Sequence, residues 1–217
     1  MNNFNWANYN NNISLFKKLS KFNKKNKFNY IENGLYNHVR DIFCLSLILT
    51  KIKKSTEKIK VLDYGSNRLS YSNLTNKLNI RKFKFFVYDP FCKKNSKFSN
   101  PNISFFNREY GLKKKWDMVN FGSSIQYLNK LSVLNKINFY NTKVILITAT
   151  PLSLSKKYLS AQKNNKNLFQ NIHSLNEILN FFKRKKFKLV FKSRNEDKFI
   201  SAKRKFKTYS LNLLFLK

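Results

Sequence analysis

The stretch that decides the fold class of this chain is VLDYGSNRLSYSNL, from Val61 to Leu74. It begins as a short apolar strand, carries Asp63 near the end of that strand, and turns at Gly65. A strand followed by a glycine turn and a helix is typical of the first unit of a nucleotide-binding α/β fold. Dinucleotide-binding loops use further glycines to approach a pyrophosphate, and this turn lacks them. The turn therefore fits a cofactor with a pyrophosphate poorly.

Strands and helices alternate along the chain on both sides of this stretch. Predicted strands span residues 60–64, 83–88, 103–106, 117–121 and 143–148, and predicted helices lie near 69–78, 126–137 and 174–185. Ser174 and Glu177 form a capping box at the start of the last helix. Two late strands, 188–192 and 208–216, face each other across a basic loop and predict an antiparallel hairpin. The alternation predicts an α/β fold, with a mostly parallel sheet and helices on both of its faces.

Length and composition predict one domain. The chain has 217 residues, of which 42% are hydrophobic, so it can bury a sizeable core but is short for two domains. Residues 1–34 are rich in Asn and Lys and predict a loose, partly helical leader, and residues 35–217 form the predicted domain. Residues 149–173 are polar and irregular in pattern, which predicts a long loop of the kind that often carries function.

The net charge of +34 is the most unusual bulk property of the chain. It arises from 37 Lys and 7 Arg, and it accompanies 33 Asn but only 4 Gly and 3 Pro. This bias follows AT-rich codons, so we attribute the basic surface mainly to composition. Arg side chains, which bind phosphates bidentately, are scarce. The lysines still attract anions, which leaves a nucleic-acid partner open but disfavoured.

Signals for a membrane span, a disulfide framework or a metal site are weak. No apolar run approaches the ~20 residues that span a bilayer, and the polar start MNNFNWANYNNN has no apolar signal core. Cys44 and Cys92 are too few for a disulfide framework, and no spacing of ligand residues indicates a metal. The sequence therefore predicts a cytoplasmic protein without a membrane span or a bound metal.

The chain has only 10 acidic residues, so their positions carry information. Asp63 lies at the end of the first predicted strand, and Asp89 closes the second. An acid roughly 20 residues after a glycine turn usually binds a ribose, because a carboxylate accepts hydrogen bonds from two adjacent hydroxyls. Asp117 starts a later strand and is expected to have a structural role. S-adenosylmethionine fits this pattern better than NAD, because it has a ribose but no phosphate.

Five segments resemble, in their order, the successive motifs of class I S-adenosylmethionine-dependent methyltransferases: VLDYGSN, VYDPF, WDMVNFGSSIQYL, VILITATPLS and LSAQKN. More narrowly, they resemble methyltransferases found in bacterial cell-surface polysaccharide gene clusters. This narrower resemblance rests on Ser123, Ser124, Gln126, Tyr127, Leu128, Thr150, Pro151, Leu152, Ser153 and Gln162. The sequence departs from the first motif at Asn67, where a second glycine is common. The resemblance implies a Rossmann-like fold with a mostly parallel seven-stranded sheet.

The resemblance also implies S-adenosylmethionine as the cofactor. The residues that it assigns to the cofactor are Asp63, Gly65 and Ser66 for the methionine part, Asp89 for the ribose, Asn107 near the adenine, and Ser123, Ser124 and Gln126 near the methyl group. Gln126 and Tyr127 begin the predicted helix 126–137 and would hold either the cofactor or the acceptor. For Tyr127, packing within that helix is the alternative.

Methyl transfer from a sulfonium is an in-line displacement, so the protein mainly aligns the acceptor with the methyl group. A hydroxyl acceptor also needs a base. His173 is the candidate base, and with Tyr127 it is a candidate catalytic residue; a structural role beside Ser174 is its alternative. The segment 149–173 would cover the acceptor, and its lysines suit an anionic acceptor such as a nucleotide-linked or lipid-linked sugar.

Three functions follow from these observations. The first is a methyltransferase for a small-molecule or glycan acceptor, which is supported by the ordered motifs and by Asp63 and Asp89. The second is an RNA methyltransferase of the same fold, which is supported by the charge. The third is a non-catalytic member that has lost its cofactor, which is supported by the missing glycines.

Overall fold

A computed structural model describes the part of the chain that forms the sheet and the elements on one of its faces. The described residues are 58–65, 83–90, 101–161, 169–194 and 207–217, with Phe43, Ser46, Leu47 and Thr50. The predicted leader, the predicted helix near 69–78 and Ser66 lie outside the described residues. Within the described residues, no helix is long and apolar enough to cross a membrane.

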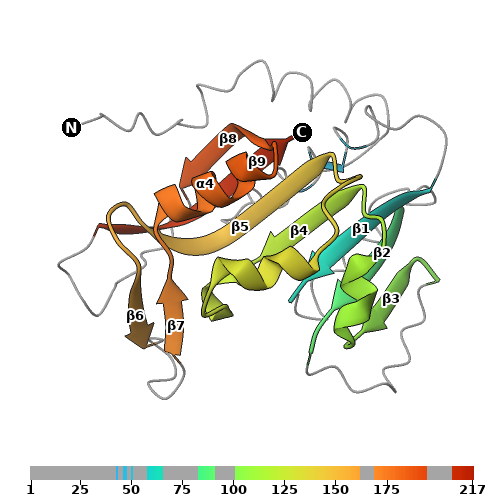
Figure 1. Ribbon diagram of the computed structural model, residues 1–217, viewed down its shortest axis with the longest axis horizontal. Coiled ribbons are helices and arrows are strands. Elements are labelled where there is room, and N and C mark those ends of the chain that lie inside the picture. Colours follow the sequence, from blue (N-terminus) through green and yellow to red (C-terminus); the bar gives the residue numbers. More distant parts are fainter. Residues whose placement is uncertain are drawn as a thin grey trace, which may run out of the picture.

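Seven strands form one twisted sheet in the order β3-β2-β1-β4-β5-β9-β8 (Figure 1). The strands are β1 (Ile59–Tyr64), β2 (Phe83–Tyr88), β3 (Ile103–Phe106), β4 (Met118–Gly122), β5 (Val144–Ser153), β8 (Lys188–Arg194) and β9 (Thr208–Leu216). The first five pair in parallel, and β9 runs antiparallel to both β5 and β8. The predicted fold class is confirmed, and so is the C-terminal antiparallel pair.

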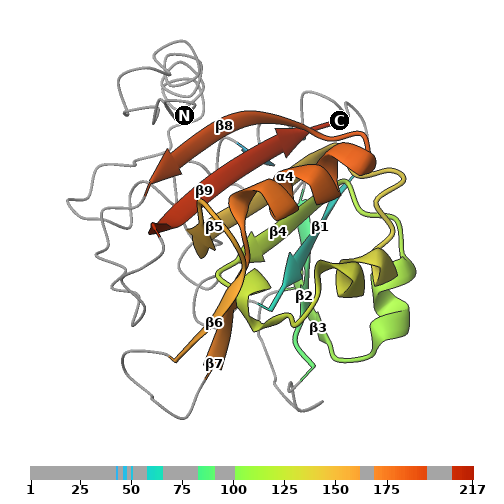
Figure 2. The ribbon, with the colours of Figure 1, turned by 60° about the vertical axis from the view of Figure 1, so that its left-hand side comes forward.

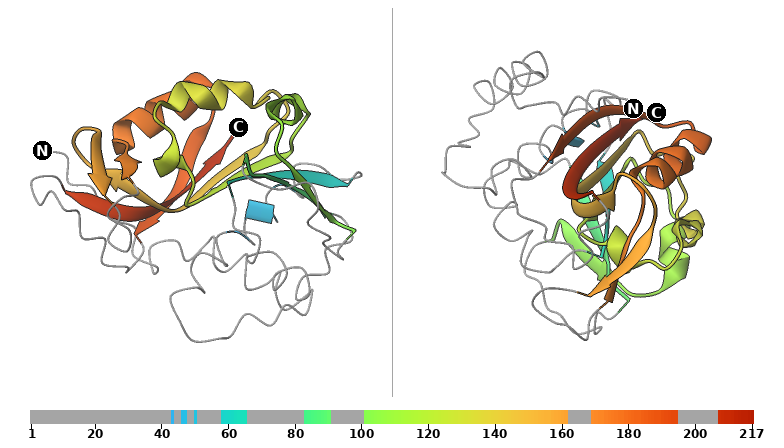
Figure 3. Two further views of the ribbon diagram at one scale, coloured as in Figure 1. Left: turned by 90° about the horizontal axis from the view of Figure 1, so that it is seen from below. Right: turned by 90° about the vertical axis from the view of Figure 1, so that its left-hand side faces the viewer.

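Both faces of the sheet are covered. The helix α4 (Leu175–Arg184) and the 3-10 helices η2 (Glu109–Lys113) and η4 (Leu131–Lys136) lie on one face (Figure 2). Phe43 and Leu47, in helical conformation, pack on the other face with β-strand residues such as Val61 and Phe85. Figure 3 shows this blue helical segment and α4 on opposite sides of the sheet.

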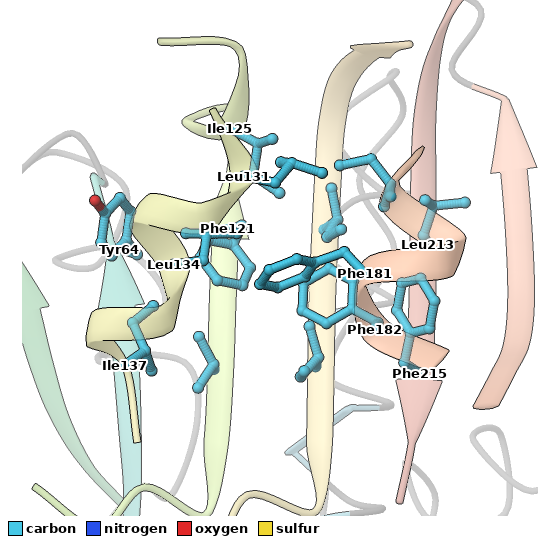
Figure 4. Close-up of a cluster of buried hydrophobic side chains, with 14 of the residues drawn as sticks. Tyr64, Phe121, Ile125, Leu131, Leu134, Ile137, Phe181, Phe182, Leu213 and Phe215 are labelled. Atoms are coloured by element: carbon cyan, nitrogen blue, oxygen red, sulfur yellow. The ribbon is translucent and has the colours of Figure 1, made fainter. Parts of the chain in front are cut away.

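Phe182 on α4 is the centre of the larger core (Figure 4). Its side chain is fully buried. Its ring packs against aromatic rings from β4 and β9, from α4 itself and from the loops on the same face of the sheet. These rings, with centroid distances from 5.0 to 6.4 Å, belong to Phe121, Phe139, Phe181, Phe187 and Phe215. Burial of one such side chain stabilises the fold by about 1.5–3 kcal/mol, so this cluster anchors α4 to β4 and β9.

The start of α4 follows the predicted capping box. The hydroxyl of Ser174 accepts a hydrogen bond from the backbone N–H of Glu177 at 3.1 Å, which pairs one of the orphan donors at the helix start. Leu175, Ile178 and Phe181 are buried at helical spacing and face the sheet, whereas Asn176 and Asn180 are exposed. The predicted N-cap and helix are confirmed, while the carboxylate of Glu177 lies 3.4 Å from Nδ1 of His173.

The prediction of one helix near residues 126–137 is correct only in part. The segment forms two short 3-10 helices, η3 (Ile125–Tyr127) and η4, separated by extended backbone at Leu128 and Lys130. Leu131, Leu134 and Ile137 are buried at every third position, which is the repeat that a 3-10 helix places on one side. The apolar spacing in the sequence is compatible with both helix types.

The prediction of an irregular loop over 149–173 is wrong for its described part. β5 continues to Ser153, and the strands β6 (Tyr158–Ala161) and β7 (Phe169–Ile172) form a separate antiparallel pair. Its alternation is mixed: Ser160 and Gln170 share the buried face with Tyr158 and Ile172, while Leu159 and Phe169 are more than half exposed. Polar residues on the buried face explain why the sequence did not look like strands.

Phe182→Ala should lower the free energy of unfolding by about 3–5 kcal/mol, because it removes a ring from a tightly packed aromatic cluster. The measurement is urea denaturation followed by circular dichroism. Phe169→Ala is the matched control, since this ring is 57% exposed and its loss should cost less than about 0.5 kcal/mol. Equal losses in the two variants would contradict the proposed role of the cluster.

Candidate functional site

The site lies where the strand order reverses. The chain runs outward from β1 to β2 and β3, and then returns to place β4 on the other side of β1. In open α/β sheets, ligands bind beyond the carboxyl ends of the strands at such a switch point. The ends of β1 and β4 lie side by side there (Figure 2). Among the predicted site residues, those at or just beyond the ends of β1, β2 and β4 are Asp63, Gly65, Asp89, Ser123, Ser124 and Gln126.

Asp63 is a fully buried carboxylate at the end of β1. Its Oδ1 accepts a hydrogen bond of 2.9 Å from Nδ2 of Asn120, which faces it in the parallel register of β1 and β4. A buried charge is tolerated only when hydrogen bonds compensate for lost water. Sequence reasoning did not single out Asn120. Its place in WDMVNFG, within the fourth strand, could have indicated it only once the register with β1 was known.

Gly65 brings the ends of β1 and β4 into contact. Its φ is +72°, and its N–H donates to the carbonyl of Tyr88 at 2.8 Å. A Cβ on Gly65 would lie 2.7 Å from the Cβ of Ser124, closer than two carbon atoms can approach. Both the conformation and the contact require glycine here. This glycine is therefore explained by strand packing, whether or not a pyrophosphate binds nearby.

Buried polar atoms follow β4. Ser124 and Gln126 are each only 4% exposed. The amide Nε2 of Gln126 donates to the hydroxyl of Ser123 at 3.2 Å. Neither Oγ of Ser124 nor Oε1 of Gln126 has a hydrogen-bond partner within the described part of the chain. Leaving such atoms buried and unpaired is costly, so their place at the switch point fits contact with a polar ligand.

Aromatic rings lie beside Asp89. Asp89 is half-buried at the end of β2, and its N–H donates to the carbonyl of Phe106 at 3.1 Å. The rings of Tyr88 and Phe106 have centroids 5.3 Å apart, and those of Tyr64 and Tyr88 are 5.0 Å apart. Asn107 is exposed immediately after β3. Phe106 also stacks on Trp116, with centroids 6.3 Å apart, so these rings belong to the packed core, and Asp89 is the residue at this strand end whose carboxylate suits a ribose.

Tyr64 is not suited to act as a base. Burial, with smaller contributions from Tyr88 and Glu109, raises the pKa of Tyr64 to about 12. Its phenol therefore stays protonated at neutral pH, and the same direction holds for the pKa of Tyr88, chiefly through burial.

The two candidate catalytic residues lie in different surroundings. Tyr127 ends η3 and is 51% exposed, so it is not packed inside a helix. His173 is fully buried between β7 and α4, and its Nε2 lies 2.9 Å from the carbonyl of Leu128. Burial lowers the pKa of His173, which makes the ring neutral at pH 7 and Nε2–H the donor in this contact. His173 thus attaches the end of η3 to the start of α4.

Asp117 has a structural role, as predicted. It is buried just before β4, at the amino ends of the strands, whereas the candidate site lies at their carboxyl ends. Its Oδ2 accepts a hydrogen bond from the backbone N–H of Lys60 at 2.8 Å, and its own N–H donates to the carbonyl of Lys60 at 2.9 Å. These two bonds extend the pairing of β1 and β4 toward their amino ends.

Comparisons with known proteins identify the fold. No family model matches the chain, and no curated protein is similar to it in sequence. Solved structures do match. The 1,6-didemethyltoxoflavin-N1-methyltransferase of Burkholderia thailandensis, with 1,6-didemethyltoxoflavin and S-adenosylhomocysteine bound, has a TM-score of 0.52 over 97% of this chain and 91% of its own, at 12% identity. The chain has the fold of a class I methyltransferase.

Two further structures support this methyltransferase fold. An S-adenosylmethionine-dependent methyltransferase from Mesorhizobium loti has a TM-score of 0.51 over 79% of this chain and 96% of its own, at 9% identity. The N-terminal domain of EvdMO1, studied in the presence of S-adenosylhomocysteine and D-fucose, has a TM-score of 0.51 over 73% of this chain and 76% of its own, at 7% identity. At such identities the likeness is one of fold.

Gly65→Ala should destabilise the methyltransferase fold by roughly 1–3 kcal/mol, because alanine is strained at positive φ and its Cβ would collide with Ser124. Urea denaturation measures the loss. Gly122→Ala is the control, since the nearest atom to its added Cβ is 3.6 Å away. Similar losses in both variants would show that the contact with Ser124 is not the cause.

Acid should weaken the fold through His173. Its pKa is lowered in the native state, so the unfolded chain binds the proton at a higher pH, and the free energy of unfolding should fall as the pH drops below about 6.5. His173→Gln keeps an N–H for the carbonyl of Leu128 but does not titrate, so its stability should fall less with pH. Urea denaturation from about pH 7.5 to about pH 5.5 compares the two. If the free energy of unfolding fell equally with pH in wild type and in His173→Gln, His173 would not be the group responsible for the loss in acid.

Proposed function

We propose that the protein is an S-adenosylmethionine-dependent methyltransferase that acts on a small-molecule or glycan acceptor. The observation that carries the proposal is the pair of buried oxygens at the switch point, Oγ of Ser124 and Oε1 of Gln126, which have no hydrogen-bond partner among the described residues and follow the buried Asp63–Asn120 pair. This arrangement occurs in a chain with the fold of class I methyltransferases, several of which contain or were studied with S-adenosylhomocysteine.

The residues at the switch point fit this cofactor. Asp89 offers a carboxylate to the ribose hydroxyls, and the exposed Asn107 after β3 can contact the adenine. Oγ of Ser124 and Oε1 of Gln126 are available to the polar groups of the methionine part. When bound, the cofactor supplies a methyl group on a sulfonium. This cofactor has no pyrophosphate, so its site does not need the further glycines that let a loop approach one. This agrees with a turn that carries Gly65 without further glycines.

The protein's part in the reaction is alignment and proton removal. Ser123 is exposed at the end of β4 and Tyr127 is exposed on η3, so both can contact an acceptor. His173 remains a candidate base, and its neutral ring meets one requirement for that role. Its burial means that a base at this position would act only after η3 moves or through a relay. Tyr127 is therefore the first candidate for contact with the acceptor.

The acceptor class is inferred from the similar folds, from the sequence resemblance and from the lysines near the site. Of the similar folds, one was solved with bound 1,6-didemethyltoxoflavin and one in the presence of D-fucose, which are both small molecules. The resemblance of Ser123–Leu128 and Thr150–Ser153 to methyltransferases of polysaccharide gene clusters favours a sugar. Lys156 and Lys157, between β5 and β6, favour an anionic sugar precursor. We therefore propose a surface-polysaccharide sugar or its precursor.

Calorimetric titration with S-adenosylhomocysteine tests the cofactor. Wild type should bind, and Asp63→Asn and Asp89→Ala should each weaken binding by about tenfold or more, since each removes a charge-assisted hydrogen bond. Glu109→Ala is the control, because Glu109 pairs with Lys136 on an exposed surface and its loss should leave affinity within about twofold. A folded wild-type protein that does not bind would overturn the proposed function.

A further inference from the structure

A chain of hydrogen bonds crosses the sheet from β8 to η3 and ends at the candidate site. Its members, in order, are Ser193, Asn212, Ala149, Ser123 and Gln126. We propose that Asn212 is a positioning residue that holds Ser123 and Gln126 in place for the cofactor, an inference that rests on the proposed function. Asn212 is fully buried on β9 and lies outside every motif that the resemblance uses.

Asn212 faces a β-bulge. Ile147 pairs with Leu213 and Thr150 pairs with Leu211, so the two residues between them on β5 oppose Asn212 alone. A bulge leaves an extra residue without a partner in the ladder. Here the N–H of Ala149 donates to Oδ1 of Asn212 at 2.9 Å, so the side chain replaces the missing backbone acceptor.

The amide of Asn212 is held from its other side. Its Nδ2 donates to the hydroxyl of Ser193 on β8 at 3.1 Å. Asparagine provides an acceptor and a donor on one short planar group, which is what this position needs. Leucine would leave the N–H of Ala149 buried without a partner, and aspartate would place a charge in the core.

Ala149, in the bulge, and Ser123, which it contacts, both have positive φ. Ala149 has φ +48° and Ser123 has φ +53°, although neither is glycine. They are joined, because the hydroxyl of Ser123 donates to the carbonyl of Ala149 at 2.9 Å. The N–H of Ser123 also donates to the carbonyl of Thr148 at 2.9 Å. Such conformations persist only where the surroundings hold them, and they are common at functional sites.

The last hydrogen bond in the chain orients the side chain of Gln126 at the candidate cofactor site. The hydroxyl of Ser123 accepts from Nε2 of Gln126, which directs Oε1 of Gln126 away from Ser123. That oxygen is buried and has no hydrogen-bond partner among the residues that the structure describes. If Asn212 is removed, the N–H of Ala149 loses its acceptor, the bulge can relax, and both Ser123 and Gln126 lose their support. The effect should therefore appear in cofactor affinity.

A double-mutant cycle on S-adenosylhomocysteine affinity tests the inference. By calorimetry, Asn212→Ala and Ser123→Ala should each weaken binding by about five- to tenfold, and the double variant should be no weaker than about the worse single variant. Asn212→Ala combined with Asp89→Ala should instead multiply the two fold-changes, because Asp89 follows β2, on the other side of β1 from β4, β5 and β9. Multiplicative effects for Asn212 and Ser123 would overturn the inference.

A control separates positioning from general stability. Leu214→Ala removes a buried apolar side chain from the same strand, and this side chain cannot take part in the chain of hydrogen bonds. It should lower the melting temperature at least as much as Asn212→Ala while leaving affinity within about twofold. Equal loss of affinity in Leu214→Ala would assign the effect of Asn212 to stability alone and overturn the inference.

A second measurement does not depend on the cofactor. In ¹H–¹⁵N correlation spectra, Asn212→Ala should shift the side-chain amide signals of Gln126, and Leu214→Ala should leave them in place. Unchanged Gln126 signals in Asn212→Ala would overturn the inference. A wild-type protein that fails to bind S-adenosylhomocysteine but shows the Gln126 shift would overturn the proposed function and keep the link between β9 and η3.

Discussion

The close approach of β1 and β4 is the constraint on which the site depends. Gly65 lets the chain leave β1 at positive φ, and the missing Cβ lets Ser124 lie against it. With the strands this close, Asp63 and Asn120 face each other in register and share a buried hydrogen bond. The same contact places the residues after β4 beside those after β1. One small residue thereby sets both the packing of the sheet and the polar lining of the switch point.

Much of the fold could be predicted from the sequence because its strands are short, apolar and separated by clear turns. Runs such as IKVLDY and FKFFVY are mostly apolar and are largely buried, and the N-cap Ser174 marks the start of α4. The pair β6–β7 could not be predicted, because its buried face mixes Ser160 and Gln170 with Tyr158 and Ile172. Its exposed positions carry Leu159 and Phe169. Local pattern fails where the buried face of a strand is polar.

The candidate site was predictable only in part, for a related reason. Asp63, Gly65 and Asp89 stand at strand ends, which can be located along the chain. Asn120 and Asn212 matter through their partners across the sheet, and those partners depend on register and on a bulge in β5. Neither the register nor the bulge has a local sequence signal. Residues that act across strands are found only when the pairing is known.

The order of the last three strands has a consequence for biosynthesis. β9 follows β8 in the chain but lies between β5 and β8 in the sheet, so β8 has no neighbour until β9 is inserted. In a nascent chain that has emerged only as far as β8, one edge of β5 is therefore unpaired and β8 has no strand partner. The sheet is complete only after β9, which ends at Leu216, has inserted between β5 and β8. This pairing joins distant parts of the chain and is therefore a slow step. Chaperones that cover exposed strand edges would act at this stage of synthesis.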